Sequence, residues 1–421
     1  MQIRVEGRHP LRGIYHGSGN SNSAMALIAA ALLTDAPVTL TNVPETASVA
    51  AMLEVGNSLG SVIKRRSGTL HLSTLHIEQS GLDREHTDAL GGTILFLAPI
   101  LARRGQAHMV IDYAISRVQP HLTALRDLGI RVTVDGGTID LVATAWDRVE
   151  IVLTQTSVTA TALACMLAAV FGNHTVIANA ASEPHVVDLL NMLVAMGAQI
   201  NGIGSNLLTI HGRKALGGAT YAVSPDHVEI ASAVALAALS GGSLTIEGIA
   251  AHDLRLIAKT YARLGVQMNF GEDSLNVPIH DEFIMSQREE DVDVSVESSP
   301  WPGFPSDLIA MATVIATQAQ GTVLIHEKLF NNRMLFIDRL NAMGAQIVLC
   351  DPHRAIVVGA TRLQGEYMDN PDVRTGLAML GAALCAEGET VIDNAQAFNR
   401  NFDHVIDKLI AVGAHIHRGE A

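Results

Sequence analysis

The sequence predicts an α/β protein with two domains, built from six copies of one β-α-β-α-β-β unit. The first observation is a phrase in which a helix ends in Leu, Met or Val followed by Gly, before a short alternating apolar strand. The glycines of the six copies are Gly60, Gly129, Gly197, Gly265, Gly344 and Gly413. Because they recur at intervals of 69, 68, 68, 79 and 69 residues, one supersecondary unit is repeated along the chain.

The second observation is a helix of small residues that precedes each phrase and ends at a β-rich strand. Five copies carry Gly at this junction, in RRGQAHMVI, VFGNHTVIA, LSGGSLTIEG, AQGTVLIHE and AEGETVID. In the first copy, LLTDAPVTL, Asp35 and Pro37 end the helix by other turn chemistry. We expect the glycines to adopt left-handed caps. A hairpin signal follows the phrase, as where Gly136 and Gly137 separate two alternating strands.

The sixth copy ends at AHIHRGEA before any return strand, whereas the chain begins with an alternating strand, MQIRVEG, whose partner is missing. We therefore expect residues 1–7 to close the sixth unit. The first three units then form one domain, residues 21–225. The second domain contains residues 1–20 and 226–421, and the chain crosses near residue 20 and near Pro225.

Composition is typical of a large globular enzyme. The chain has 421 residues, of which 48% are hydrophobic, which is enough for two cores. No apolar run is long enough for a transmembrane helix, no secretory signal is recognised, and the three cysteines follow no pattern. A cytoplasmic protein is expected. The formal charge of −14 argues against nucleic-acid binding, which needs a basic face.

The small-residue helices begin with polar residues that suit an anionic ligand. Helix starts present free N–H groups and a partial positive charge, so several of them at one cleft would attract phosphate. The alternative is that these residues are ordinary N-caps. The six starts are Ser21-Asn22, Thr87-Asp88, Thr156-Ser157, Asp226-His227, Ser306-Asp307 and Asp372-Val373.

Over nearly its full length the chain resembles the enolpyruvyl transferases of the EPSP synthase superfamily, and most of all the branch that acts on UDP-N-acetylglucosamine. The resemblance is carried by SGNSNSAMALIAAALL, ASEPHVVDLLNMLVAMGAQI, YAVSPDHVEIASAVALAAL, SPWPGFPSDLIAMA, FNNRMLFIDRLNAMGA and NRNFDHVIDKLIAVGA. It implies a two-domain inside-out α/β barrel with substrate in the cleft between the domains. It also implies transfer of the enolpyruvyl group of phosphoenolpyruvate to a sugar hydroxyl, with release of phosphate and without a metal or redox cofactor.

The resemblance assigns several residues of the second domain to the site. Asp307 matches the catalytic acid of the family, and Arg400 matches an arginine that holds phosphoenolpyruvate. Arg333 and Arg374 match two further arginines, and Asp372 lies at the start of the same helix as Arg374. Guanidinium suits this task because its fork binds carboxylate and phosphate bidentately.

In the first domain the resemblance is partial. Asn22 is retained, whereas Ser21 and Gly91 stand where the family has a lysine and an arginine. Arg117 replaces a family arginine only after a shift of one residue, and the loop before it has no cysteine. His121 and Ser157 are retained, while Gln155 replaces a lysine that holds the nucleotide and Thr159 replaces a glycine.

Two classes of function therefore stay open. The first is an enolpyruvyl transferase whose catalytic residues are Asp307, Arg400 and Arg117. The second is a diverged, non-catalytic paralogue that binds a nucleotide sugar or another anion. His415 and His417 are closely spaced, but on a terminal strand they are interpreted as solvated side chains, and no metal site is predicted.

Overall fold

Two compact units make up the chain in the structure, a computed structural model that describes residues 1–89, 91–286, 294–369 and 375–419. Unit 1 contains Met1–Ser18 and Pro225–Ala421, and unit 2 contains Gly19–Ser224. The domains predicted from the repeats differ from these units by one or two residues at each crossing. Their assignment as functional domains stays a prediction.

Unit 2 holds three four-stranded sheets within its described residues, ordered β14-β3-β5-β4, β6-β7-β9-β8 and β10-β11-β13-β12. In each sheet the first pair is parallel and the other two pairs are antiparallel. The strands are β3 (Val38–Thr41), β4 (Val62–Arg66), β5 (Thr69–Ser73), β6 (Gly81–Leu82), β7 (Gln106–Val110), β8 (Arg131–Asp135), β9 (Thr138–Val142), β10 (Trp146–Val152), β11 (Gly172–Ala178), β12 (Gln199–Asn201), β13 (Leu207–His211) and β14 (Thr220–Ala222).

The helices of unit 2, with η denoting 3₁₀ helices, are α1 (Ser21–Ala31), α2 (Ala47–Ser58), α3 (Arg84–Ala89), η1 (Gly91–Phe96), α4 (Leu97–Arg104), η2 (Ile115–Arg117), α5 (Gln119–Asp127), α6 (Val158–Phe171) and α7 (Pro184–Ala195).

Unit 1 repeats the same sheet pattern in the orders β2-β15-β17-β16, β18-β19-β21-β20 and β22-β23-β1-β24 among its described residues. Its strands are β1 (Ile3–Glu6), β2 (Arg12–His16), β15 (Ser243–Glu247), β16 (Asn269–Phe270), β17 (Ser274–Val277), β18 (Val294–Glu297), β19 (Gly321–His326), β20 (Gln346–Asp351), β21 (Arg354–Gly359), β22 (Tyr367–Met368), β23 (Glu389–Ile392) and β24 (His415–Arg418). Its helices are α8 (His227–Leu239), η3 (Ala251–Leu254), α9 (Arg255–Arg263), η4 (Ser306–Leu308), α10 (Ile309–Gln318), α11 (Ile337–Ala342), α12 (Gly376–Cys385), η5 (Ala395–Arg400) and α13 (Val405–Ala411).

The N-terminal strand closes the sixth repeat, as the sequence predicts. β1 lies antiparallel between β23 and β24, in the place that β21 takes in the preceding sheet. The structure also shows an exchange of strands between repeats, which was not predicted from the sequence. β2 pairs in parallel with β15, and β14 pairs in parallel with β3, so each of these two sheets takes its first strand from a distant part of the chain.

The six glycine phrases have the predicted conformation. All six glycines have positive φ, between 85° and 109°, which is a left-handed backbone that favours glycine. Gly136 and Gly137 also have positive φ and join β8 to β9. Gly172 contradicts the expectation of a left-handed cap, because its φ is −94°. A Cβ there would lie 2.4 Å from Nε1 of Trp146, so close packing demands this glycine.

The predicted helix starts are only partly correct. Ser157 and Asp226 are N-caps of α6 and α8. For α1 the cap is Asn20, whose side chain accepts a hydrogen bond from the N–H of Ser23. Thr87 lies inside α3, and its hydroxyl donates to the carbonyl of Val110 at 2.6 Å. Ser306 and Asp307 lie in η4 and make no cap, and Asp372-Val373 lies outside the described residues.

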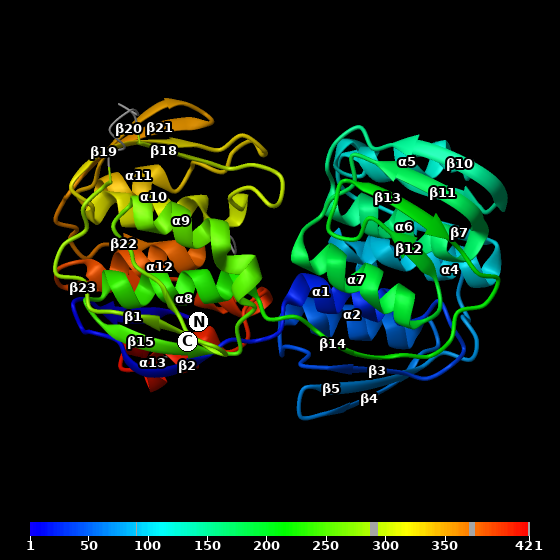
Figure 1. The fold of residues 1–421 in the computed structure, drawn as a ribbon, viewed down its shortest axis with the longest axis horizontal. Coiled ribbons are helices and arrows are strands. Elements are labelled where there is room, and N and C mark those ends of the chain that lie inside the picture. The colour runs from blue at the N-terminus through cyan, green and yellow to red at the C-terminus, as the bar shows by residue number, and fades with distance from the viewer. Residues whose placement is uncertain (90, 287–293, 370–374, 420–421) are drawn as a thin grey trace. The chain divides into compact units, whose positions relative to one another are not determined.

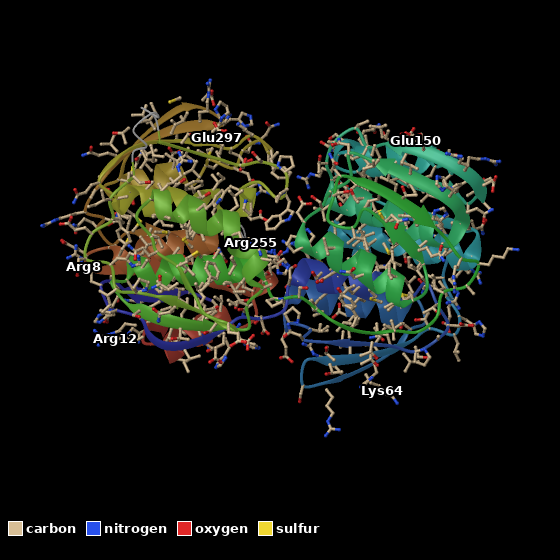
Figure 2. All side chains as sticks on the ribbon, in the orientation of Figure 1. Arg8, Arg12, Lys64, Glu150, Arg255 and Glu297 are labelled. Atoms are coloured by element: carbon tan, nitrogen blue, oxygen red, sulfur yellow. The ribbon has the colours of Figure 1, made fainter. Side chains whose placement is uncertain are left out.

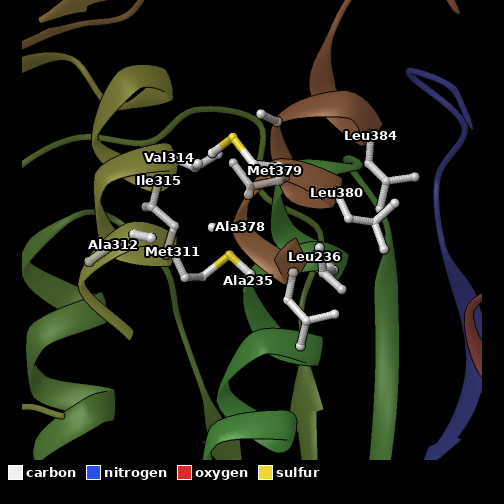
Figure 3. Packing of buried hydrophobic residues seen from close by; sticks show 14 of the residues in the cluster. Ala235, Leu236, Met311, Ala312, Val314, Ile315, Ala378, Met379, Leu380 and Leu384 are labelled. Carbon is white, nitrogen blue, oxygen red and sulfur yellow. The ribbon is translucent and has the colours of Figure 1, made fainter. Parts of the chain in front are cut away.

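In each unit the small-residue helices lie at the centre and the sheets surround them (Figure 1). α8, α10 and α12 pack on one another through residues such as Leu236, Met311 and Leu380 (Figure 3). A Cβ on Gly381 would lie 3.2–3.4 Å from side chains of α8 and α10, so the contact is close. Charged side chains such as Lys64 and Glu150 project outward from the sheets (Figure 2). This is the inside-out α/β barrel that the resemblance implies.

Among the described residues, no helix is both long enough and apolar enough to cross a membrane.

A buried polar network joins three elements of unit 1. The carboxylate of Glu229 on α8 is 1% exposed and accepts hydrogen bonds from Nζ of Lys408 (2.7 Å) and from the hydroxyl of Tyr15 (2.8 Å). Lys408 also donates to Ser18 Oγ. Burial raises the pKa of Glu229, and the ammonium group of Lys408 counteracts that shift. The network connects α8 with β2 and α13.

Asp226 is buried next to this network. Its carboxylate accepts hydrogen bonds from the N–H groups of Val228 and Glu229, which begin α8. Burial, followed by repulsion from Glu229, raises the pKa of Asp226 from 3.8 to about 7, and the charge of Asp307 adds to the shift. The carboxyl group of Asp226 therefore destabilises the fold when it is ionised.

We predict that Asp226→Asn makes unit 1 more stable at pH 8 and that this gain shrinks as the pH falls toward 5. The pKa of Asp226 is higher in the folded chain, so its contribution to stability is full below pH 3.8 and is lost as the pH rises through about 7. A gain on the order of 1–3 kcal/mol is expected at pH 8, since Asn keeps the cap. Urea unfolding midpoints at pH 5.5 and pH 8 measure it. A gain that does not depend on pH would contradict the prediction, and Asp226→Ala, which removes the cap, is the control.

Candidate active site

Asp307 and Arg333, two of the residues assigned by resemblance, form an ion pair in unit 1. Asp307 lies in η4, just before α10, and its carboxylate accepts a hydrogen bond from Nη1 of Arg333 at 2.7 Å. The side chain of Asp307 is 45% exposed, whereas that of Arg333 is 15% exposed. The guanidinium carbon of Arg333 lies 4.1 Å from the centroid of the Phe330 ring. The Phe330 ring therefore supports the guanidinium group of Arg333. That group is paired with the carboxylate of Asp307, which solvent or substrate can reach.

Glu327 orders this ion pair from the interior of the unit. It is completely buried and accepts hydrogen bonds from Ser298 Oγ (2.9 Å), Ser306 Oγ (2.5 Å) and the N–H groups of Leu329 (2.8 Å) and Phe330 (3.1 Å). Because Ser306 donates its proton to Glu327, its oxygen lone pairs are free to accept from Arg333 Nη1 at 2.8 Å. The buried glutamate thus fixes both the loop that carries Arg333 and the turn that carries Asp307.

Glu327 was not among the site residues predicted from the sequence, although the strand pattern contains a signal for it. In β19 the buried residues alternate, as in Val323 and Ile325, and Glu327 follows at the same spacing. Side chains two residues apart share a face of a strand, so this glutamate continues the inward-facing row. A buried carboxylate must find several donors, which a sequence cannot place.

The start of α8 lies beside the Asp307 turn. His227, the first residue of α8, packs edge-on against Trp301, with ring centroids 5.2 Å apart and an interplanar angle of 60°. Asp307 is close enough to raise the pKa of Asp226. The starts of α8 and η4, from two different repeats, therefore lie close together in unit 1, and their binding of phosphate stays a prediction.

The remaining residues assigned in unit 1 are arginines and an aspartate near the C-terminal repeat. Arg400 is exposed at the end of η5, after the buried Phe398. Asp372 and Arg374 lie outside the described residues, so their assignment stays a prediction.

In unit 2, residues of two repeats meet at His121. Its Nε2 lies 2.7 Å from Thr159 Oγ1, and burial lowers the pKa of His121 to about 4, so the ring is neutral at physiological pH. Ser157 caps α6 by accepting from the N–H of Ala160. Gln155 is exposed just before this cap. These four residues place hydroxyl, imidazole and amide groups around the start of one helix, where an anion is favoured.

Ser21 and Asn22 begin α1 and differ in exposure. The hydroxyl of Ser21 is buried and lies 3.0 Å from Thr46 Oγ1, whereas Asn22 is exposed. Asn22 is thus the more accessible of the two assigned residues.

The loop before α5 carries Arg117. Its guanidinium lies 5.8 Å from the ring centroid of Tyr113, and it is exposed. Asp112 in the same loop pairs with Arg84. Gly91, at the start of η1, has space for a Cβ, since no other atom would lie within 4 Å of it. The position at which the family has an arginine is therefore open.

Comparison with known proteins gives consistent results. Residues 5–409 match the family model described as EPSP synthase (3-phosphoshikimate 1-carboxyvinyltransferase). The chain is 42% identical to UDP-N-acetylglucosamine 1-carboxyvinyltransferase of Bradyrhizobium diazoefficiens, covering 99% of this chain and 98% of the relative. It is 39% identical to the enzyme of the same name from Treponema denticola, covering 98% of both chains.

Two solved structures share the fold. The enolpyruvyl transferase NikO from Streptomyces tendae aligns with a TM-score of 0.88 and 22% identity, covering 99% of this chain and 98% of that one. EPSP synthase from Acinetobacter baumannii aligns with a TM-score of 0.77 and 15% identity over the whole of both chains. With a family model that spans nearly the whole sequence and full-length relatives at about 40% identity, the chain belongs to the EPSP synthase family of enolpyruvyl transferases.

Proposed function

We propose that this protein transfers the enolpyruvyl group of phosphoenolpyruvate to a hydroxyl of UDP-N-acetylglucosamine. In the reaction the acceptor oxygen bonds to C2 of phosphoenolpyruvate, the bond from C2 to the phosphate oxygen breaks, and the hydroxyl proton leaves with the products. The observation that carries the proposal is sequence identity of 42% and 39%, over nearly the full length, to enzymes named for this activity. The alternative of a non-catalytic binding protein has no such support.

The residues of unit 1 suit the chemistry at the reacting atoms. Asp307 is a carboxylate that is accessible and yet fixed by Arg333, so it can exchange a proton with a hydroxyl at a defined position. Arg333 and Arg400 provide guanidinium groups for the carboxylate or phosphate of phosphoenolpyruvate, and we propose that Arg374 and Asp372 act with them. No metal or redox cofactor is required by this scheme.

The residues of unit 2 suit recognition of the acceptor. His121, Ser157, Thr159 and Gln155 surround the start of α6 and offer neutral hydrogen-bonding groups to a nucleotide sugar. We propose that Asn22 and Ser21 contribute at the start of α1 and that Arg117 contacts an anionic group. We propose that the reaction takes place in the cytoplasm, as a step of peptidoglycan synthesis.

We predict that wild-type protein releases phosphate from phosphoenolpyruvate when UDP-N-acetylglucosamine is present and that Asp307→Asn slows the release about 10²–10⁴-fold, since it removes the acid-base group. Asp407→Asn, which removes an exposed pair with Arg418 in the same unit, should keep the wild-type rate. Release without acceptor, or a fully active Asp307→Asn, would contradict the assignment. Binding of the nucleotide sugar without any turnover, including with other sugars and shikimate 3-phosphate, would support the non-catalytic alternative.

Glu327→Gln should lower kcat about tenfold or more while the protein stays folded. The amide presents one oxygen and two N–H groups to four donors, so Ser306 or the loop carrying Arg333 must shift. Steady-state kinetics and circular dichroism together measure this effect. Glu297→Gln, on the neighbouring strand and paired with Lys328, is the matched control. An unchanged kcat in Glu327→Gln would show that the network is not needed for turnover.

Gly91→Arg should lower the KM for phosphoenolpyruvate. The position is open, and one hydrogen bond to a charged group contributes about 1.5–3 kcal/mol, which corresponds to roughly 10- to 100-fold. Gly91→Ala adds no charge and should keep the wild-type KM. If the arginine variant has the same KM as the alanine variant, the position does not face the substrate.

A further inference from the structure

A cluster of metal-ligating side chains lies in unit 1, at residues that the proposed reaction does not use. One ligand atom each from Glu6, His9 and His415 lies within 4.8 Å of the others. His415 Nδ1 is 3.3 Å and His9 Nε2 is 3.6 Å from Oε2 of Glu6, and His417 Nε2 is 3.6 Å from the other carboxylate oxygen. In the sequence only His415 and His417 are closely spaced. The fold adds the two ligands from the opposite end of the chain.

The strand exchange that closes the sixth repeat assembles the cluster. β1 and β24 are antiparallel, and Glu6 is paired directly with His415. His417 lies two residues further along β24, on the same face of the sheet. After Glu6 the chain turns through Arg8, which has a φ of 64°, and it then runs past the end of α13, since the N–H of Arg12 donates to the carbonyl of Val412. This path brings His9 against His415.

The two imidazole rings are stacked, with centroids 3.5 Å apart and an interplanar angle of 7°. An imidazole binds a metal ion through the lone pair of a neutral ring nitrogen. Lone pairs lie in the ring plane, and therefore the rings must turn to bind one ion. The side chains of His9 and His415 are 39% and 49% exposed, which leaves them room to do so.

The spacing and charge suit a tetrahedral ion. Ligands about 2.0–2.2 Å from such an ion lie roughly 3.4 Å apart, close to the separations of Glu6 from both histidines. Three arginines on or next to β1 and β24 are paired with other carboxylates. Arg4 pairs with Glu389, Arg8 with Glu387 and Arg418 with Asp407. Two imidazoles and one carboxylate favour zinc over magnesium or calcium, which prefer oxygen ligands.

We propose that Glu6, His9 and His415 form a binding site for one Zn²⁺ ion, with His417 holding the carboxylate of Glu6 from its other oxygen. The ion joins the first strand of the chain, the loop that follows it and the last strand. Its effect is to fasten both ends of the chain to the sheet β22-β23-β1-β24. The site is independent of enolpyruvyl transfer, and its loss leaves that activity in place.

The test uses the full-length, tag-free protein after treatment with a chelator. Zn²⁺ is titrated in competition with a chromophoric chelator, and thermal unfolding is recorded with and without Zn²⁺. We expect one equivalent to bind tightly and to raise the unfolding midpoint, because an ion that binds the folded chain stabilises it by mass action. Mg²⁺ should have neither effect. Co²⁺ should give the visible absorption of a tetrahedral site.

The double variant His9→Gln/His415→Gln should lose this equivalent and the shift in midpoint, and His417→Gln should weaken binding about 10–100-fold. His252→Gln removes an exposed histidine beside Asp253 in the same unit and should bind as the wild type does. The midpoints without metal show whether each variant is folded. The proposal is overturned if the wild type takes up no equivalent of Zn²⁺, or if the double variant binds it equally well.

Discussion

Burial of one small-residue helix per repeat is the constraint on which the structure depends. A helix that is covered on all sides must be apolar all round and must allow close approach, which explains the Ala-rich sequences of α1, α6, α8 and α12. Gly381 shows how close that approach is, because even a Cβ there would touch side chains of two neighbouring helices. The sheets then cover the helices, and their outer faces carry the charged residues (Figures 1 and 2).

The same constraint positions the candidate active site of unit 1. When α8 and α10 pack together, the residues before them meet as well, and so Trp301 contacts His227 and the charge of Asp307 acts on Asp226. The polar groups at these helix starts cannot be left without partners inside the unit. Glu327 accepts a hydrogen bond from Ser306 in η4, in a network that ends at Arg333. Glu229 in α8 forms a separate network with Tyr15 and Lys408. Packing of the helices thus makes the site rigid, and the buried carboxylates orient its polar side chains.

The exchange of strands has a separate consequence at the ends of the chain. β1 closes a sheet whose other strands come from the last repeat, so the first and last described strands, β1 and β24, are neighbours. Side chains more than 400 residues apart in sequence, such as Glu6 and His415, then become contacts. A metal site composed of them adds to a junction that is held by backbone hydrogen bonds, by the buried side chains of Ile3, Val5 and Ile416, and by exposed ion pairs. Exposed ion pairs each contribute little.

The repeats, the left-handed glycines and the closure of the sixth repeat by residues 1–7 were all predictable from the sequence, because they rest on local periodicity and on backbone conformations that favour glycine. The resemblance implied only that Asp307 and Arg333 belong to one site, and the structure shows that their side chains are hydrogen-bonded. The strand exchange of β2 and β14, the close packing at Gly172 and the buried role of Glu327 were decided by tertiary structure. Each depends on atoms from distant segments, and a local pattern holds no information about which donor or side chain will lie opposite.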